Sequence, residues 1–155
     1  MPAWNGAWSA TEATAYLRES TVPIRLACRT PSGGLWMLSL WYAYHDGEFL
    51  CATGADADVV RYLEADAGVA FEVSDNEPPY RGVRGSGTVS IEADEGKTLL
   101  RELLERYLGG TDNSLADRLL DDGREEVALR ITPEKLYTWD FTDRMADAAQ
   151  ADDGP

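Results

Sequence analysis

The stretch from residue 23 to residue 53 decides the fold, and it reads PIRLACRTPSGGLWMLSLWYAYHDGEFLCAT. In its first part, residues 23–30, apolar side chains alternate with others, which is typical of a β-strand. Gly33-Gly34 then turns the chain into residues 35–44, an almost uninterrupted apolar run rich in aromatic residues. Such a run predicts a strand that is buried on both faces and lies centrally in the sheet.

The same patterns predict the other elements. Asp46-Gly47 is a hairpin-turn sequence. Further strands are expected over 48–53, 69–74, 80–92, 126–132 and 136–141. Helices are expected over 9–19, 56–64, 95–108 and 114–120. Many strands with short connections and few helices predict a mainly β (α+β) fold, a six- to seven-stranded antiparallel barrel with flanking helices. We expect one domain over 1–143 and a disordered acidic tail over 144–155.

Acidic residues dominate the composition. Twenty-eight Asp and Glu face fourteen Lys and Arg, which gives a net charge of −14. Because molar salt shortens the Debye length to about 3 Å, this surface suits a salt-rich cytoplasm and predicts a halophilic protein. The alternative is an ordinary acidic protein with an acidic end. Either way, nucleic acids and anionic membranes are disfavoured as partners, since phosphate backbones are bound mainly by clustered Lys and Arg.

Localisation and metal binding follow from what the sequence does not contain. No stretch approaches the roughly 20 apolar residues of a membrane span. Residues 1–5 have neither a basic start nor an apolar core, so a secretory signal is not visible and a cytoplasmic location is expected. Cys28 and Cys51 lie in apolar strands without a CxxC spacing, which predicts buried free thiols and no metal site.

The order of elements resembles the pyridoxamine 5′-phosphate oxidase-like flavin-binding split barrels. The resemblance covers roughly residues 9–142 and lies in order and spacing. It rests on Pro23-Ile24-Arg25-Leu26-Ala27, Trp36-Met37-Leu38-Ser39-Leu40-Trp41-Tyr42, Asp46-Gly47, Phe49-Leu50-Cys51-Ala52-Thr53, the helix and strand over 59–73, and Tyr80-Arg81-Gly82-Val83-Arg84-Gly85-Ser86-Gly87. It implies a Greek-key split barrel.

The resemblance also implies a homodimer that binds FMN in a groove between subunits, while some relatives bind the deazaflavin F420 or haem. The backbone of Leu38, Ser39, Leu40 and Trp41 would lie along the flavin ring. Thr53, Gly54, Ala55 and Arg61 would hold the phosphate. Trp139 would approach the ring from the partner subunit.

One departure from that family bears on the cofactor. The family usually places Lys or Arg in the first turn of the helix near the phosphate, whereas this chain has Asp56 and Asp58. A phosphate dianion needs Arg, Lys or backbone N–H donors. Either Arg61 with Arg25 or Arg84 takes over that role, or the cofactor is absent or different. These arginines could instead pair with surface carboxylates.

Two functions are therefore compared. The first is an FMN-binding flavoprotein, an oxidoreductase of a small-molecule substrate, in which the cofactor performs the redox step and no catalytic side chain is predicted. The second is a non-catalytic split-barrel binding protein that has lost tight flavin binding. A metallohydrolase is poorly supported, because one histidine and scattered carboxylates form no ligand set.

Overall fold

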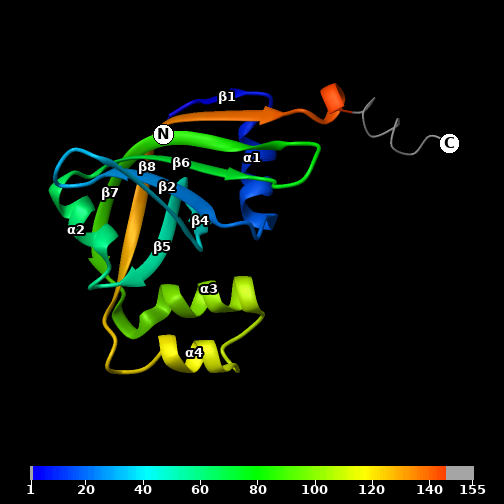
Figure 1. Ribbon diagram of the computed structural model, residues 1–155. Helices are drawn as coiled ribbons and strands as arrows, with labels where there is room; N and C mark the ends of the chain where they lie inside the picture. Colours follow the sequence, from blue (N-terminus) through cyan, green and yellow to red (C-terminus); the bar gives the residue numbers. More distant parts are fainter. Residues whose placement is uncertain (1, 146–155) are drawn as a thin grey trace.

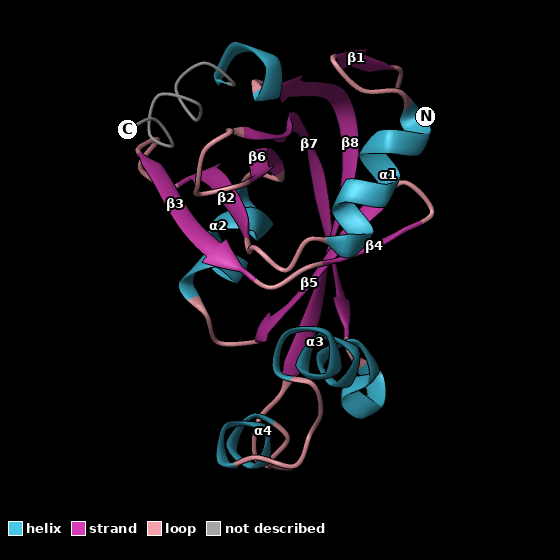
Figure 2. Cartoon of the chain, turned by 90° about the vertical axis from the view of Figure 1, so that its right-hand side faces the viewer, coloured by secondary structure: helices cyan, strands magenta, loops and turns pink. Residues whose placement is uncertain are grey.

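The computed structural model describes residues 2–145, which form a mainly antiparallel sheet with flanking helices (Figures 1 and 2). The strands are β1 (Trp4–Gly6), β2 (Ile24–Arg29), β3 (Leu35–Leu40), β4 (Ala43–His45), β5 (Glu48–Gly54), β6 (Gly68–Ser74), β7 (Arg81–Ala93) and β8 (Glu126–Asp140). The helices are α1 (Ala10–Glu19), α2 (Asp58–Ala65), α3 (Thr98–Leu108) and α4 (Ser114–Leu119), and a 3-10 turn, η1 (Glu95–Lys97), precedes α3.

The two longest strands, β7 and β8, are the spine of the sheet. They pair with each other along almost their whole length, and the strand order is β3-β2-β6-β7-β8-β5-β4. β1 adds to β8 in parallel, and the other pairings are antiparallel. The predicted mainly β antiparallel architecture is confirmed. The structure has eight strands within residues 2–145. β1 was not expected, the expected strand over 35–44 is divided into β3 and β4, and the strands expected over 126–132 and 136–141 are the single strand β8.

An aromatic cluster fills the inside of the curved sheet. The Phe49 side chain is fully buried, and its ring centroid lies 4.9 Å from that of Phe71 and 5.8 Å from that of Tyr42. Leu17 on α1 and Leu63 on α2 pack against the same core. These two helices therefore cover parts of the core that the sheet alone would leave exposed to solvent.

Residues at the ends of α1 and α3 satisfy backbone groups that the helices leave free. Ser9 and Glu12 form a capping box at the start of α1. α3 ends at Gly109, whose φ of 78° is the left-handed conformation that glycine adopts without steric cost. α3 and α4 stack beneath β5 on the outside of the sheet in both views (Figures 1 and 2).

The prediction that residues 35–44 form one central strand is wrong. β3 ends at Leu40, β4 begins at Ala43, and β3 lies at one end of the strand order with β2 as its single neighbour among the described strands. Leu35 is 86% exposed and Met37 63% exposed. An uninterrupted apolar run indicates that both faces of a strand are apolar. It does not determine whether the second face is covered by this chain or by another molecule.

Two further corrections concern the end of the sheet. The strands expected over 126–132 and 136–141 are one continuous strand, β8, which passes through Pro133. The register between β7 and β8 shifts between Ser86 and Gly87, opposite this proline. A bulge tolerates the missing N–H of proline, so the strand bends there and does not stop.

Residues 142–145 form a helical turn, which includes Arg144 and Met145 of the predicted tail. The rest of that prediction, residues 146–155, lies outside the described residues. Within residues 2–145, no helix is both long and apolar enough to cross a bilayer. Cys28 and Cys51 are buried free thiols, as predicted.

Candidate functional site

A groove of about 810 Å³ runs across the outer face of the sheet. We call it the sheet-face groove and define it by Arg25, Ala27, Met37, Ala70, Ser86 and Tyr137, which come from five strands. Its volume is that of a small-molecule site. The groove forms because neighbouring strands place small side chains in register on this face.

The floor of the sheet-face groove is flat. Ala27 on β2 faces Ala70 on β6, and Ala70 faces Ser86 on β7. Gly85 adds to this floor, and a Cβ built there would lie 2.2 Å from the Lys135 carbonyl oxygen and 2.7 Å from the Phe71 ring. Glycine is therefore required at residue 85 for β6, β7 and β8 to approach one another this closely.

A row of charged residues borders this floor. Arg25 on β2, Glu72 on β6 and Arg84 on β7 lie directly opposite one another across three strands. The Arg84 Nε lies 3.7 Å from a Glu72 carboxylate oxygen, and the Ser74 hydroxyl donates to the other oxygen at 2.9 Å. The row therefore has two guanidinium groups around one carboxylate.

Arg84 is held over an aromatic surface. Its guanidinium carbon lies 4.0 Å from the centroid of the Trp139 ring and 5.9 Å from that of Tyr137. Trp139 is 7% exposed, whereas Tyr137 is 48% exposed and forms one wall of the groove. This cation–π contact favours a position of the guanidinium over the indole face.

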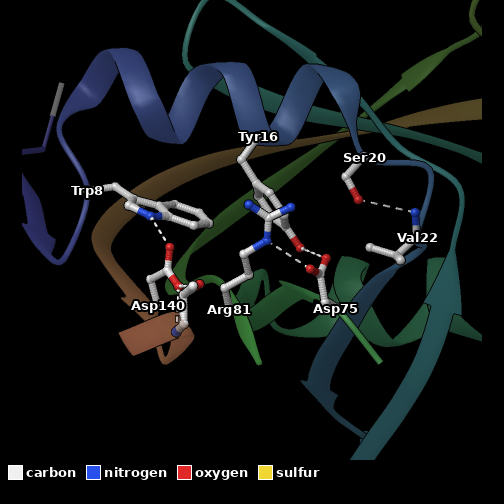
Figure 3. A network of polar contacts seen from close by, with 8 residues as sticks. Trp8, Tyr16, Ser20, Val22, Asp75, Arg81 and Asp140 are labelled. Atoms are coloured by element: carbon white, nitrogen blue, oxygen red, sulfur yellow. Dashed lines mark hydrogen bonds and ion pairs between the residues drawn. The ribbon is translucent and has the colours of Figure 1, made fainter. Parts of the chain in front are cut away.

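A polar network fixes the end of β8 that carries Trp139 (Figure 3). The Tyr16 hydroxyl donates to Asp75 at 2.8 Å, and Arg81 Nε donates to the same carboxylate at 2.9 Å. Trp8 Nε1 donates to Asp140 at 3.1 Å. Because Arg81 and Asp140 are opposite each other in the β7–β8 pair, these contacts tie α1 and residue 8 to the strand ends beside the groove.

The same network shifts two pKa values. Burial raises the pKa of the Tyr16 hydroxyl above its ordinary value, and the hydrogen bond to the Asp75 carboxylate raises it further. At Asp140, burial raises the pKa, but hydrogen bonds from Thr142 and Trp8 outweigh this effect, so the pKa lies below its usual range. At neutral pH the Tyr16 phenol is therefore neutral and the Asp140 carboxyl is charged.

A second hollow, of about 740 Å³, lies where β5 leads into α2. We call it the α2 pocket and define it by Thr53, Gly54, Ala55, Asp56, Arg124 and Glu125. Arg124 Nη2 and Nε donate to one oxygen of Glu126 at 3.0 and 3.3 Å. The Glu126 side chain is 2% exposed, so this ion pair anchors Arg124 beside Gly54.

The ten predicted site residues fall into separate groups. Arg84 and Trp139 lie together at the sheet-face groove, and Ser39 faces Arg25 in the β2–β3 pair on the same side. Thr53, Gly54 and Ala55 lie together at the α2 pocket. The two hollows are on the order of 30 Å apart along β8, at about 3.3 Å per residue.

The other predicted residues lie elsewhere. Leu38 and Leu40 pack against the barrel core. Trp41 stacks on Tyr107 of α3, with ring centroids 5.2 Å apart and 9° between the planes. Arg61 pairs with Asp58 at 2.6 Å on the exposed side of α2, which is the surface-pair alternative noted for the arginines.

Several residues at the two hollows escaped the sequence analysis. Glu72, Lys135, Tyr137 and Arg124 were not singled out, because nothing in the local sequence distinguishes them from other surface residues. The signal for Glu72 is cross-strand, since it lies between Arg25 and Arg84 only once the β2–β6–β7 register is known.

No protein-family model matches the sequence, and no curated protein matches it significantly. Several solved structures do match. The conserved hypothetical protein Rv2991 from Mycobacterium tuberculosis is 26% identical over 86% of both chains, with a TM-score of 0.71. An F420 reductase is 25% identical with a TM-score of 0.65, over 77% of this chain and 92% of the reductase.

A candidate pyridoxamine 5′-phosphate oxidase from Listeria innocua has a TM-score of 0.63 over 83% of this chain and 95% of its own, at 12% identity. That identity supports the fold alone. The fold is a split β-barrel. The fold class predicted from the order of strands and helices is thereby confirmed.

Proposed function

We propose that the protein binds a flavin-type cofactor, FMN or the deazaflavin F420, between two copies of the chain. We further propose that it acts as an oxidoreductase on a small-molecule substrate. The cofactor would supply the electron or hydride transfer, while the protein supplies position and electrostatics. F420 stands beside FMN because the chain is 25% identical to an F420 reductase over most of that protein's length.

The observation that carries this proposal is the exposed apolar edge formed by β3. Leu35, Trp36 and Met37 are consecutive and are 86%, 41% and 63% exposed. Contiguous apolar surface on an edge strand is a liability unless another molecule covers it. A second copy packed on β3 would cover these side chains and close a groove along the strand.

The proposed cofactor site combines β3 with the α2 pocket. The Trp36 ring on β3 contacts the Tyr62 ring on α2 edge to face, with centroids 5.7 Å apart. β3 and α2 are thus neighbours within one protomer. A ring along the backbone of residues 38–41 would direct its phosphate chain toward Thr53, Gly54 and Ala55.

Arg124 is the residue at the α2 pocket whose chemistry fits a phosphate. Its guanidinium side chain is 46% exposed and remains accessible beside Gly54 while it pairs with Glu126. In this proposal Arg61 does not contact the phosphate. Its ion pair with Asp58 neutralises one of the two carboxylates near the start of α2, and Asp56 is the other.

Arg84 and Trp139 would act from the other subunit. Their distance from the α2 pocket along β8 is too long for one flavin to span within a single protomer. Two-fold symmetry would place the Arg84 side of one copy against the β3 edge of the other.

A non-catalytic binding protein is the second candidate, and the α2 pocket favours it. Asp56 and Glu125 line this pocket beside Arg124, so its described carboxylates outnumber its cations. Like charges near a phosphate dianion oppose its binding. This charge balance predicts weak retention of FMN even if the flavin ring binds along β3.

We also propose that the protein works in a salt-rich cytoplasm. The support is the excess of 28 acidic over 14 basic residues. Screening at high ionic strength removes the repulsion that this excess creates.

The test is native purification at high salt, followed by a visible spectrum and fluorescence titrations with FMN and F420. A flavin or deazaflavin spectrum, or saturable binding of either compound, supports the proposal. A colourless protein that binds neither compound contradicts it.

A matched pair of variants locates the cofactor. Ala55→Glu adds a carboxylate to the α2 pocket, and we expect it to weaken FMN binding by about tenfold or more. Ala65→Glu makes the same change at the opposite end of α2 and should have no effect. Equal FMN affinity in the two variants would remove the α2 pocket from the site.

A further inference from the structure

The sheet-face groove is cationic in a protein that is strongly anionic. The described side chains that line it carry three cations, Arg25, Arg84 and Lys135, and two carboxylates, Glu72 and Glu134. In four other hollows formed by residues 2–145, carboxylates equal or outnumber cations. With a net charge of −14 over the whole chain, this local excess of positive charge distinguishes the groove.

The two arginines of the charged row have capacity left for a ligand. Among the described residues, Arg25 donates one hydrogen bond, to the neutral side chain of Asn76 at 3.4 Å. Arg84 faces Glu72 at the long distance of 3.7 Å. A guanidinium has five N–H donors, so most donors of Arg25 and Arg84 can still bind an anion.

The spacing of the row suits one anionic group. Adjacent strands lie about 4.8 Å apart, so the Arg25 and Arg84 backbones are roughly 10 Å apart with Glu72 between them. Long arginine side chains can converge from this separation onto a single carboxylate or phosphate above Glu72. The Ser74 hydroxyl meanwhile donates to Glu72 from the side of the row that is away from the floor.

The floor beside the row suits a flat apolar group. Ala27, Ala70 and Ser86 lie two residues along their strands from Arg25, Glu72 and Arg84, which is about 7 Å. Met37 and Tyr137 rise at the two sides of this floor. A planar body on the floor would therefore carry its anionic group directly to the arginines.

We propose that the sheet-face groove binds the substrate, a small molecule that joins a flat apolar body to one carboxylate or phosphate. Arg25 and Arg84 bind the anionic group, and Trp139 positions Arg84 from beneath. The binding site stands on its own geometry. Only the statement that its ligand is the substrate rests on the flavin function proposed above.

The probe for this site is 1-naphthyl phosphate, with 1-naphthol as its neutral counterpart, each titrated into the full-length protein by calorimetry. We expect 1-naphthyl phosphate to bind at least about tenfold more tightly than 1-naphthol. Arg25→Gln and Arg84→Gln should each weaken the binding of 1-naphthyl phosphate by about tenfold and leave the affinity for 1-naphthol unchanged.

Arg29→Gln is the matched control. Arg29 lies on the same strand and the same face as Arg25 but pairs with Asp66 at 3.5 Å and does not line the groove. We expect this variant to bind both probes as the wild-type protein does. Unchanged 1-naphthol binding in the Arg84→Gln variant shows that its groove is still folded, and Arg84→Lys should recover part of the affinity for the phosphate.

Two results would overturn the proposal. One is equal affinity of the wild-type protein for the two probes, and the other is unchanged 1-naphthyl phosphate affinity in both Arg25→Gln and Arg84→Gln. A comparison of FMN with riboflavin separates cofactor from substrate. If the two variants bind FMN more weakly but bind riboflavin as the wild-type protein does, the groove holds the cofactor phosphate. The assignment of the groove to the substrate is then wrong.

The proposed function fails in a different way. A wild-type protein that binds no flavin yet binds 1-naphthyl phosphate through Arg25 and Arg84 contradicts the flavin proposal and supports the anion site.

Discussion

The guanidinium of Arg84 stacks on the buried indole of Trp139, with the guanidinium carbon 4.0 Å from the ring centroid. This contact joins two predicted site residues from different strands, Arg84 on β7 and Trp139 on β8. It also explains how an exposed arginine on a curved sheet keeps one orientation, since the indole face restricts it.

Arg84→Met should keep the packing of the side-chain stem and lose the cation. Because the Arg84 side chain is 53% exposed, we expect a loss of only about 0.5–1 kcal/mol in the free energy of unfolding. Urea titration followed by tryptophan fluorescence measures it. Arg29→Met serves as the control, and equal losses in the two variants would argue against a specific Arg84–Trp139 interaction.

Charge on the β3 edge should disrupt the proposed dimer. The double variant Leu35→Glu/Met37→Glu places two carboxylates on the exposed apolar surface, and burying them in an interface would cost several kcal/mol. Sedimentation velocity should show a dimer for the wild-type protein and a monomer for this variant. Leu108→Glu, which changes an exposed leucine on α3, should stay dimeric. A monomeric wild-type protein would contradict the prediction.

The Arg124–Glu126 ion pair should be needed to keep Glu126 buried. Arg124→Met leaves a carboxylate that is 2% exposed without its cation, and we expect a loss of about 1–3 kcal/mol in unfolding free energy. The double variant Arg124→Met/Glu126→Leu removes both charges and should recover most of this loss. Chemical denaturation of the three proteins tests it, and a double variant no more stable than the single one would refute the explanation.

Stability should fall at alkaline pH. Burial raises the pKa of Tyr42 above its ordinary value of about 10, and the charge of Arg106 only partly offsets this. Because this pKa is higher in the folded state than in the unfolded state, the contribution of Tyr42 to the free energy of unfolding is complete below about pH 10. This contribution is lost as the pH rises toward the folded-state pKa. Urea midpoints measured from pH 8 to pH 11 should decline above about pH 10.

Tyr42→Phe should flatten that decline, at the cost of the hydrogen bond from the Tyr42 hydroxyl to the Leu17 carbonyl. Tyr80→Phe, at a tyrosine that is 43% exposed, should leave the pH profile unchanged. Identical profiles for the two variants would show that Tyr42 does not contribute to the decline.

Salt should stabilise the protein. Raising KCl from about 0.1 M to about 1 M shortens the Debye length from about 10 Å to about 3 Å and screens the net charge of −14. We expect Tm to rise by about 5 °C or more, measured by calorimetry. Chloride is used because sulfate stabilises proteins by exclusion from their surface. A constant Tm would contradict the high-salt proposal.

Local sequence signals predicted the helices and strands well where these depend on interactions between residues that are close in the sequence. The helices expected over 9–19 and 95–108 and the alternation over residues 23–30 each depend on contacts within a few residues. The split-barrel order of strands was also recognisable from their spacing. Pro133 misled the prediction because a bulge, which depends on the partner strand, lets β8 continue through it.

The candidate site was predicted only in part, because its residues meet across strands. The sequence named Arg84 as a candidate phosphate ligand. Its neighbours Arg25 and Glu72 are 59 and 12 positions away in the sequence and become adjacent only through the β2–β6–β7 register.

The sequence by itself determined the acidity of the protein, the strands and helices, and the small residues that leave room for a groove. Only the tertiary structure decided that the apolar run over residues 35–40 is an exposed edge and that Arg25, Arg84 and Lys135 line one groove on the sheet. The physical reason is that side-chain periodicity depends on the local backbone, whereas strand order and register depend on the free energy of the whole packed sheet.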